Sequence, residues 1–125
     1  MTATTPDAAS HPALALLRDV AAQIRAREAA AQAALDNNYD TAAHAAALDE
    51  KCAVLIDLPD RITPLLTDMP RHLAEMIQDQ VRNMALRARQ ARKVNSVFYK
   101  ASLLYPDDYA PGQPNELELF IEQLG

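Results

Sequence analysis

The sequence predicts an all-α protein, an antiparallel bundle of three main helices with one long helix at about residues 71–105 and a short terminal helix. Only two glycines and no tryptophan occur, and alanine supplies much of the apolar content, a composition that favours helix over strand. Apolar residues recur at helical spacing, and no segment alternates as a strand does. At 125 residues, the chain fits one domain, with the bundle at about residues 13–105.

The first expected element is a mostly disordered lead, residues 1–12, because it is small, polar and punctuated by proline. A helix is predicted over about residues 13–36. Its stripe is thin, alanine-rich and close to heptad spacing, through Leu14, Leu17, Ala21, Ile24, Glu28, Ala31 and Leu35. Asparagine and aspartate at 36–40 predict a tight turn, with Asp40 as the N-cap of the next helix, so the first two helices form a hairpin.

A second helix is predicted over about residues 41–58. Its apolar seam comprises Ala45, Leu48, Cys52 and Leu55. The charged residues of this helix are expected mostly outside, namely Asp49, Glu50, Lys51 and Asp57. Prolines punctuate the following connection, and a proline inside a helix costs about 3 kcal/mol. Residues 59–66 are therefore either a kinked extension of the helix or a separate short turn.

The long helix predicted over residues 71–105 contains neither proline nor glycine, and Asp68 and Pro70 precede it as start signals. At about 1.5 Å per residue it would be roughly 50 Å long. Asn95 is a polar residue on its seam, where it either fixes the register or contacts a partner. The seam follows a four–three repeat through Ile77, Val81, Met84, Ala88, Ala91, Asn95, Phe98, Ser102 and Tyr105.

The last segment, residues 106–125, is an acidic, proline-rich tail with a short helix that Asn115 is expected to cap. Four residues at helical spacing give this helix one apolar face, Leu117, Phe120, Ile121 and Leu124. That face is self-masking, partner-binding or part of the core. We expect deletion of the tail to leave helicity and melting largely intact.

No catalytic or metal-binding constellation can be assembled from the sequence. The D-x-N-x-D run at 36–40 begins like a calcium loop, but Thr41 and Ala47 stand where that loop needs glycine and glutamate. The three histidines lie in different elements, none beside a second ligand at metal spacing. Cys52, on an apolar seam, is expected to be a buried, inert thiol. We therefore expect a protein that is not an enzyme and needs no cofactor or metal.

Charge is unevenly distributed along the chain. The formal net charge of −5 gives no general case for nucleic acid or an anionic membrane. No acid occurs between Asp79 and Asp107, a span that holds Arg82, Arg87, Arg89, Arg92, Lys93 and Lys100. We favour a solvated face with intrachain ion pairs over phosphate binding, because aromatic residues are not interleaved.

The termini and the cysteine content bear on localisation. The chain has a single cysteine, no apparent signal peptide and no apolar run of the ~20 residues that would span a bilayer. These features fit a cytoplasmic protein without a membrane span.

Several helix features occur together in an arrangement typical of one family. Glu28 precedes Ala34-Leu35, and residues 38–40 form the break between the first two helices. The second helix carries a Leu-x-x-Lys-x-x-x-Leu-type pattern, in Leu48, Lys51, Leu55 and Leu58. Asn95 precedes the paired leucines 103–104 in the long helix. Over residues 13–105 the chain thus resembles the small cytoplasmic chaperones of flagellar type III export, the FlgN/FliT-like family.

The resemblance implies a protein-binding chaperone that holds the helical end of an export substrate, prevents premature assembly and releases it at the export gate. That task needs an exposed apolar helix face. The candidate partner-binding residues are Val94, Asn95, Val97, Phe98, Ala101, Leu104 and Tyr105 on the long helix, and Leu117, Phe120, Ile121 and Leu124 on the tail. The alternative is a small helical adaptor or oligomerisation module not linked to flagella, and a homodimer is left open.

Overall fold

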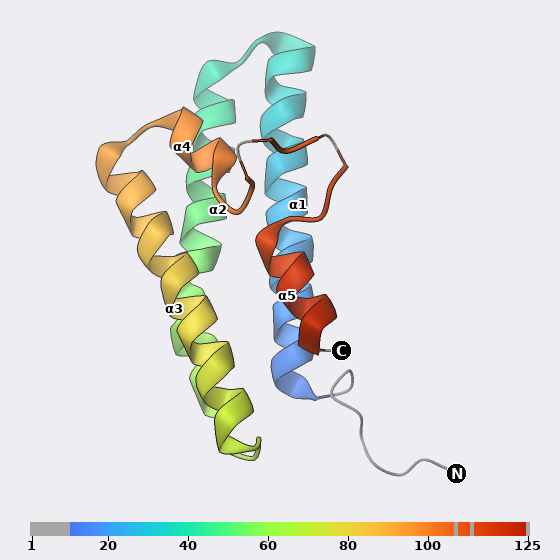
Figure 1. The fold of residues 1–125 in the computed structure, drawn as a ribbon. Coiled ribbons are helices and arrows are strands. Elements are labelled where there is room, and N and C mark those ends of the chain that lie inside the picture. The colour runs from blue at the N-terminus through green and yellow to red at the C-terminus, as the bar shows by residue number, and fades with distance from the viewer. Residues whose placement is uncertain (1–10, 107, 111, 125) are drawn as a thin grey trace.

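The computed structural model describes residues 11–106, 108–110 and 112–124, and over these residues the chain is an all-α bundle, as predicted (Figure 1). A 3-10 turn, η2 (Thr63–Leu66), links the second and third long helices. The helices in chain order are α1 (Pro12–Asn38), α2 (Thr41–Ile62), α3 (Arg71–Val94), α4 (Val97–Ser102) and α5 (Glu116–Leu124).

Helices α1 and α2 form the predicted hairpin, and α3 returns beside α2 (Figure 1). The turn is tighter than predicted, because α1 continues to Asn38 and only Tyr39 and Asp40 leave the helix. Tyr39 takes the left-handed backbone conformation (φ 52°), and its N–H bonds to the carbonyls of the last helical turn. The Asp40 side chain accepts a hydrogen bond from the Ala43 N–H at 2.9 Å, which confirms the predicted cap.

The predicted disordered lead, residues 1–12, lies outside the described residues except for its last two positions. His11 caps α1, with its Nδ1 accepting from the Ala13 N–H at 3.0 Å. Pro12 is the first helical residue, where a proline is tolerated because its missing N–H would have no helical partner.

Helix α2 extends four residues beyond its predicted end at Leu58 and passes through Pro59. The segment is thus an extension of the helix, followed by η2. Leu58, Ile62 and Leu66 are all buried in the main core and lie four residues apart. Each such burial contributes about 1.5–3 kcal/mol, which together exceeds the roughly 3 kcal/mol cost of an internal proline.

The predicted long helix, residues 71–105, is wrong beyond Val94. Asn95 takes the left-handed conformation (φ 57°), and its N–H bonds to the Ala91 and Arg92 carbonyls, which ends α3. Ser96 then caps α4, with its Oγ accepting from the Tyr99 N–H at 3.3 Å. Asparagine enters the left-handed region more readily than most residues, and serine is a strong N-cap. Asn95 is therefore a helix-ending residue and does not occupy a bundle seam.

The main core lies where α1, α2 and α3 face one another, and α5 completes it along α1. Figure 1 shows α5 running antiparallel to α1. The capping prediction for α5 is confirmed, because Asn115 Oδ1 accepts from the Glu118 N–H at 2.9 Å. Core residues with no solvent exposure come from α1, α2, α3 and α5 and include Leu17, Ile24, Leu55, Ile77, Val81 and Leu117.

Candidate partner-binding site

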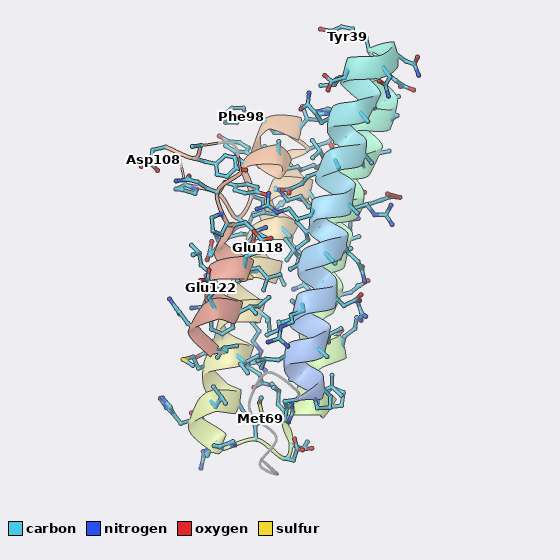
Figure 2. The ribbon with its side chains drawn as sticks, turned by 90° about the vertical axis from the view of Figure 1, so that its right-hand side faces the viewer. Tyr39, Met69, Phe98, Asp108, Glu118 and Glu122 are labelled. Carbon is cyan, nitrogen blue, oxygen red and sulfur yellow. The ribbon has the colours of Figure 1, made fainter. Side chains whose placement is uncertain are left out.

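The bend between α3 and α4 carries a group of exposed apolar side chains. Phe98 is 73% exposed and Val94 is 62% exposed, and Val97 and Tyr99 are exposed as well. The Phe98 and Tyr99 rings meet edge to face with centroids 6.0 Å apart. In Figure 2, Phe98 points away from the bundle at the outer side of α4. We call this surface the elbow patch, formed by Val94, Val97, Phe98 and Tyr99.

A groove of about 410 Å³ lies beside the patch. Val94 and Tyr99 border this groove, which we call the elbow groove. The buried side chains of Leu103 and Leu104 contribute to its lining. The complete lining is Arg87, Gln90, Ala91, Val94, Tyr99, Ser102, Leu103, Leu104 and Tyr105.

Lys51, on α2, binds the carboxyl end of α4 through hydrogen bonds to its backbone. Its side chain is 0% exposed, and its Nζ donates to the carbonyls of Lys100 at 3.0 Å, Ala101 at 3.1 Å and Leu103 at 2.9 Å. The Nζ also lies 2.9 Å from Glu28 Oε2 as an ion pair. Burial lowers the pKa of Lys51, and the neighbouring Glu28 carboxylate opposes that shift. The expectation that Lys51 lies mostly outside is therefore wrong, because these carbonyls and Glu28 compensate its loss of water.

Tyr105 joins α1 to the segment that follows α4. Its hydroxyl donates to Glu28 Oε1 at 2.5 Å, and the Lys51 ammonium lies 5.2 Å from the centre of its ring. Burial raises the pKa of Tyr105, and the hydrogen bond to Glu28 raises it further. Tyr105 therefore contacts Glu28 and Lys51 inside the bundle and also lines the elbow groove.

Arg25 fastens the tail to α1. Its guanidinium makes two hydrogen bonds to Glu118, at 2.6 and 3.1 Å, and a third to the Gln113 carbonyl at 2.9 Å. The hydrogen bonds from Arg25 lower the pKa of Glu118. Arg87 on α3 pairs with Glu116 at 2.7 Å, so both ends of the tail helix's first turn are held by arginines from the bundle.

Asp49 on α2 forms ion pairs with a residue of α3 and a residue of α4, one on each side of the bend. Arg92 makes two hydrogen bonds to its carboxylate, each 3.0 Å, and Lys100 Nζ lies 3.4 Å from Oδ1. The Arg92 hydrogen bonds lower the pKa of Asp49. Lys100 also donates to Asn95 Oδ1 at 3.0 Å, which couples the residue that ends α3 to α4. These ion pairs confirm intrachain pairing for part of the basic span.

The structure divides the predicted partner-binding residues into two groups. An exposed group surrounds the elbow, and it consists of Val94, Asn95, Val97, Phe98 and Ala101. Leu104, Leu117 and Phe120 are buried in the core, Tyr105 is occupied by Glu28, and the partly buried Ile121 and Leu124 pack against the core. The tail face therefore belongs to the core, because its apolar side chains pack into the main core where α5 lies along α1.

Tyr99 is a patch residue that the sequence prediction missed. In a continuous helix Tyr99 lies about 100° round from Phe98, off the face that holds the predicted partner-binding residues. The signal that could have found Tyr99 is the Asn95-Ser96 pair, an asparagine suited to ending a helix followed by an N-cap residue. Because α3 ends there and α4 begins at Val97, positions in one continuous helix no longer decide which of the two aromatic side chains is exposed, and both are exposed.

The cysteine and the possible metal ligands of the described residues do not form a reactive or metal-binding site. Cys52 is buried, as predicted, and burial raises the pKa of its thiol. The residues that the structure describes contain no group of three or more His, Cys, Asp or Glu side chains that could hold a metal ion. Within the same residues, no helix has the length and apolar character required to cross a bilayer.

Comparison of the chain with family models, with curated proteins and with solved structures gave no match.

Proposed function

We propose that this chain is a protein-binding module that holds an amphipathic helix of a partner protein at the elbow patch. The observation that supports this most directly is the exposure of Phe98, Tyr99, Val94 and Val97 together, beside a groove whose lining includes the buried side chains of Leu103 and Leu104. Neighbouring exposed apolar residues of this kind mark interaction surfaces on soluble domains. Helix-in-groove recognition uses such a surface, with apolar anchors spaced along one face of the bound helix.

The rigid support of α4 favours binding without large rearrangement. An isolated helix of six residues is too short to be stable in water, so α4 depends on its contacts. Lys51 donates to two carbonyls of the last turn of α4 and to that of Leu103, which follows it, and Lys100 ties the helix to Asp49 and Asn95. A partner that docks on this preorganised surface loses less affinity to ordering of the site.

The more specific proposal is that the partner is an export substrate of the flagellar type III system. This rests on the resemblance of residues 13–105 to the FlgN/FliT-like chaperones. In this proposal the elbow patch covers the helical end of the substrate until export. A chaperone of this kind needs a surface for binding and no catalytic group.

The first prediction concerns Phe98, tested with purified secreted flagellar hook, junction and cap proteins that have helical ends. Phe98→Ser should weaken binding of the recognised protein by at least about 30-fold, because truncating an aromatic anchor typically costs about 2 kcal/mol or more. Isothermal titration calorimetry measures the change. Since Phe98 is exposed, the melting temperature of the free protein should stay nearly unchanged.

The matched control is Met76→Gln, an exposed apolar residue of α3 that lies about 27 Å from Val94 along the helix axis. This variant should bind like the wild type. Absence of binding to every secreted flagellar protein would remove the chaperone proposal. Concentration-dependent dimerisation in sedimentation equilibrium that Phe98→Ser abolishes would instead favour the oligomerisation module.

A further inference from the structure

The outer face of α3 carries a basic stripe next to the elbow patch. Arg82, Arg89 and Lys93 are exposed and lie seven and four residues apart, so they share one side of the helix. Leu86, 51% exposed, lies on the same side among them. We call Arg82, Arg89 and Lys93 the α3 stripe.

The stripe differs from the other basic residues of this span in having no ion pair. Arg87 pairs with Glu116, while Arg92 and Lys100 pair with Asp49. Among the residues that the structure describes, Arg82, Arg89 and Lys93 have neither an ion pair nor a side-chain hydrogen bond to another residue. The three cations are thus left available on a chain whose net charge is −5.

The stripe borders the elbow groove. Gln90 and Val94 line that groove and follow Arg89 and Lys93 directly in sequence, so they lie about 100° further round the same helix. A ligand seated in the groove and on Val94 therefore passes beside the ammonium of Lys93 and the guanidinium of Arg89.

We propose that the partner held at the elbow patch is an acidic amphipathic helix that lies along α3. Its apolar side contacts the elbow patch, the groove and Leu86, and its glutamate or aspartate side chains face the α3 stripe. This inference rests on the proposed function, and it further specifies that the bound helix is negatively charged. Complementary charge of this kind selects partners and accelerates encounter more than it adds raw affinity.

The charge pattern and the groove disfavour other occupants of this face. In a symmetric dimer across the face, Arg82, Arg89 and Lys93 would lie close to their own copies, and like charges repel. A nucleic acid presents no row of apolar side chains that could fill the elbow groove and cover the elbow patch beside the stripe. The concave groove also matches protruding side chains of a helix better than it matches a flat lipid surface.

The test uses three synthetic 18-residue helical peptides with the same leucine face and with glutamate, glutamine or lysine on the polar face. Fluorescence anisotropy measures their binding to the full chain at 50 and 300 mM NaCl. The glutamate peptide should bind about tenfold more tightly than the lysine peptide at low salt, and the difference should shrink at high salt. Charge reversal in R89E/K93E should abolish or invert the preference.

The matched control is Arg61→Glu, an exposed arginine in the last turn of α2, and it should keep the wild-type preference. Figure 1 shows this end of α2 at the opposite end of the bundle from α4. Equal binding of all three peptides that Phe98→Ser abolishes would leave the helix-binding function standing and overturn the acidic partner. Failure of all three to bind would overturn both. Binding to phosphatidylglycerol vesicles or to an RNA oligonucleotide that R89E/K93E abolishes would also overturn the acidic-helix assignment.

Discussion

At the residue scale, Lys51 is the side chain on which the geometry of the elbow most depends. The last carbonyls of any helix lack intrahelical partners, and in α4 a lysine from α2 supplies donors to that end of the helix. Glu28 offsets the charge of the ammonium and also accepts from Tyr105. The ammonium of this α2 residue therefore connects α1 with the end of α4.

Replacing Lys51 by methionine should lower the free energy of unfolding by about 3–5 kcal/mol, because the carbonyls of Lys100, Ala101 and Leu103 lose their donor and Glu28 loses the shorter of its two ion pairs. Urea unfolding followed by circular dichroism measures this. Arg27→Met, which removes a surface ion pair with Glu50, is the control and should cost no more than about 1 kcal/mol. Similar losses in the two variants would contradict the anchoring role of Lys51.

At the element scale, the tail helix α5 is a structural part of the bundle. Leu117 and Phe120 are buried in the main core, and Arg25 and Arg87 hold the first turn of α5 through Glu118 and Glu116. The expectation that deletion of residues 106–125 leaves melting largely intact does not fit this packing. Removing the tail would expose the apolar surface of α1 that it covers.

Phe120→Ala should accordingly destabilise the fold by about 3–5 kcal/mol, the usual range for removing a buried aromatic side chain. Leu119→Ala is the control on the same helix, and because Leu119 is about half exposed it should cost much less. Thermal melting of both variants measures the difference. Equal melting temperatures for Phe120→Ala and the wild type would show that α5 is dispensable.

At the scale of the whole molecule, ion pairs between elements predict sensitivity to acid. Glu118 and Asp49 have pKa values lowered by hydrogen bonds from Arg25 and Arg92. In the unfolded chain these carboxylates bind protons at higher pH than in the folded chain. Their stabilising contribution is therefore complete above about pH 5 and is lost as the pH falls below about 4.

The free energy of unfolding should thus decrease from pH 5 to pH 2, measured by urea titration at each pH. Glu118→Gln should be less stable at neutral pH but should show a shallower decrease in acid. Glu122→Gln, an exposed carboxylate of the same helix labelled in Figure 2, is the control and should follow the wild type. Identical acid slopes for Glu118→Gln and the wild type would contradict this contribution of Glu118.

The sequence predicted those features that depend on local pattern. The caps at Asp40 and Asn115 and the start of α3 at Arg71 were found because cap residues and prolines act on their own neighbours. The break at Asn95 was missed, since no proline or glycine marks it and the four–three repeat continues across it. The burial of Lys51 depends on carbonyls about fifty residues away, which no local pattern reports.

The candidate site was predicted in part for the same reason. Phe98, Val97 and Val94 were found from their apolar character near the end of the predicted long helix. Leu104 and the tail residues were assigned to the same surface because sequence cannot tell an apolar face that packs on α1 from one that remains open. The path of the chain after Asn95, which the sequence does not reveal, decides which apolar face is packed and which stays exposed.

The burial of Lys51 has a practical consequence for labelling. The chain has three lysines, and the structure buries Lys51 and Lys100 while leaving Lys93 exposed at the end of α3, beside Val94 of the elbow patch. An amine-reactive dye applied to the folded protein should therefore modify Lys93 as its main side-chain target. A single fluorophore at that position would lie next to the proposed docking surface and would report directly when a partner occupies it.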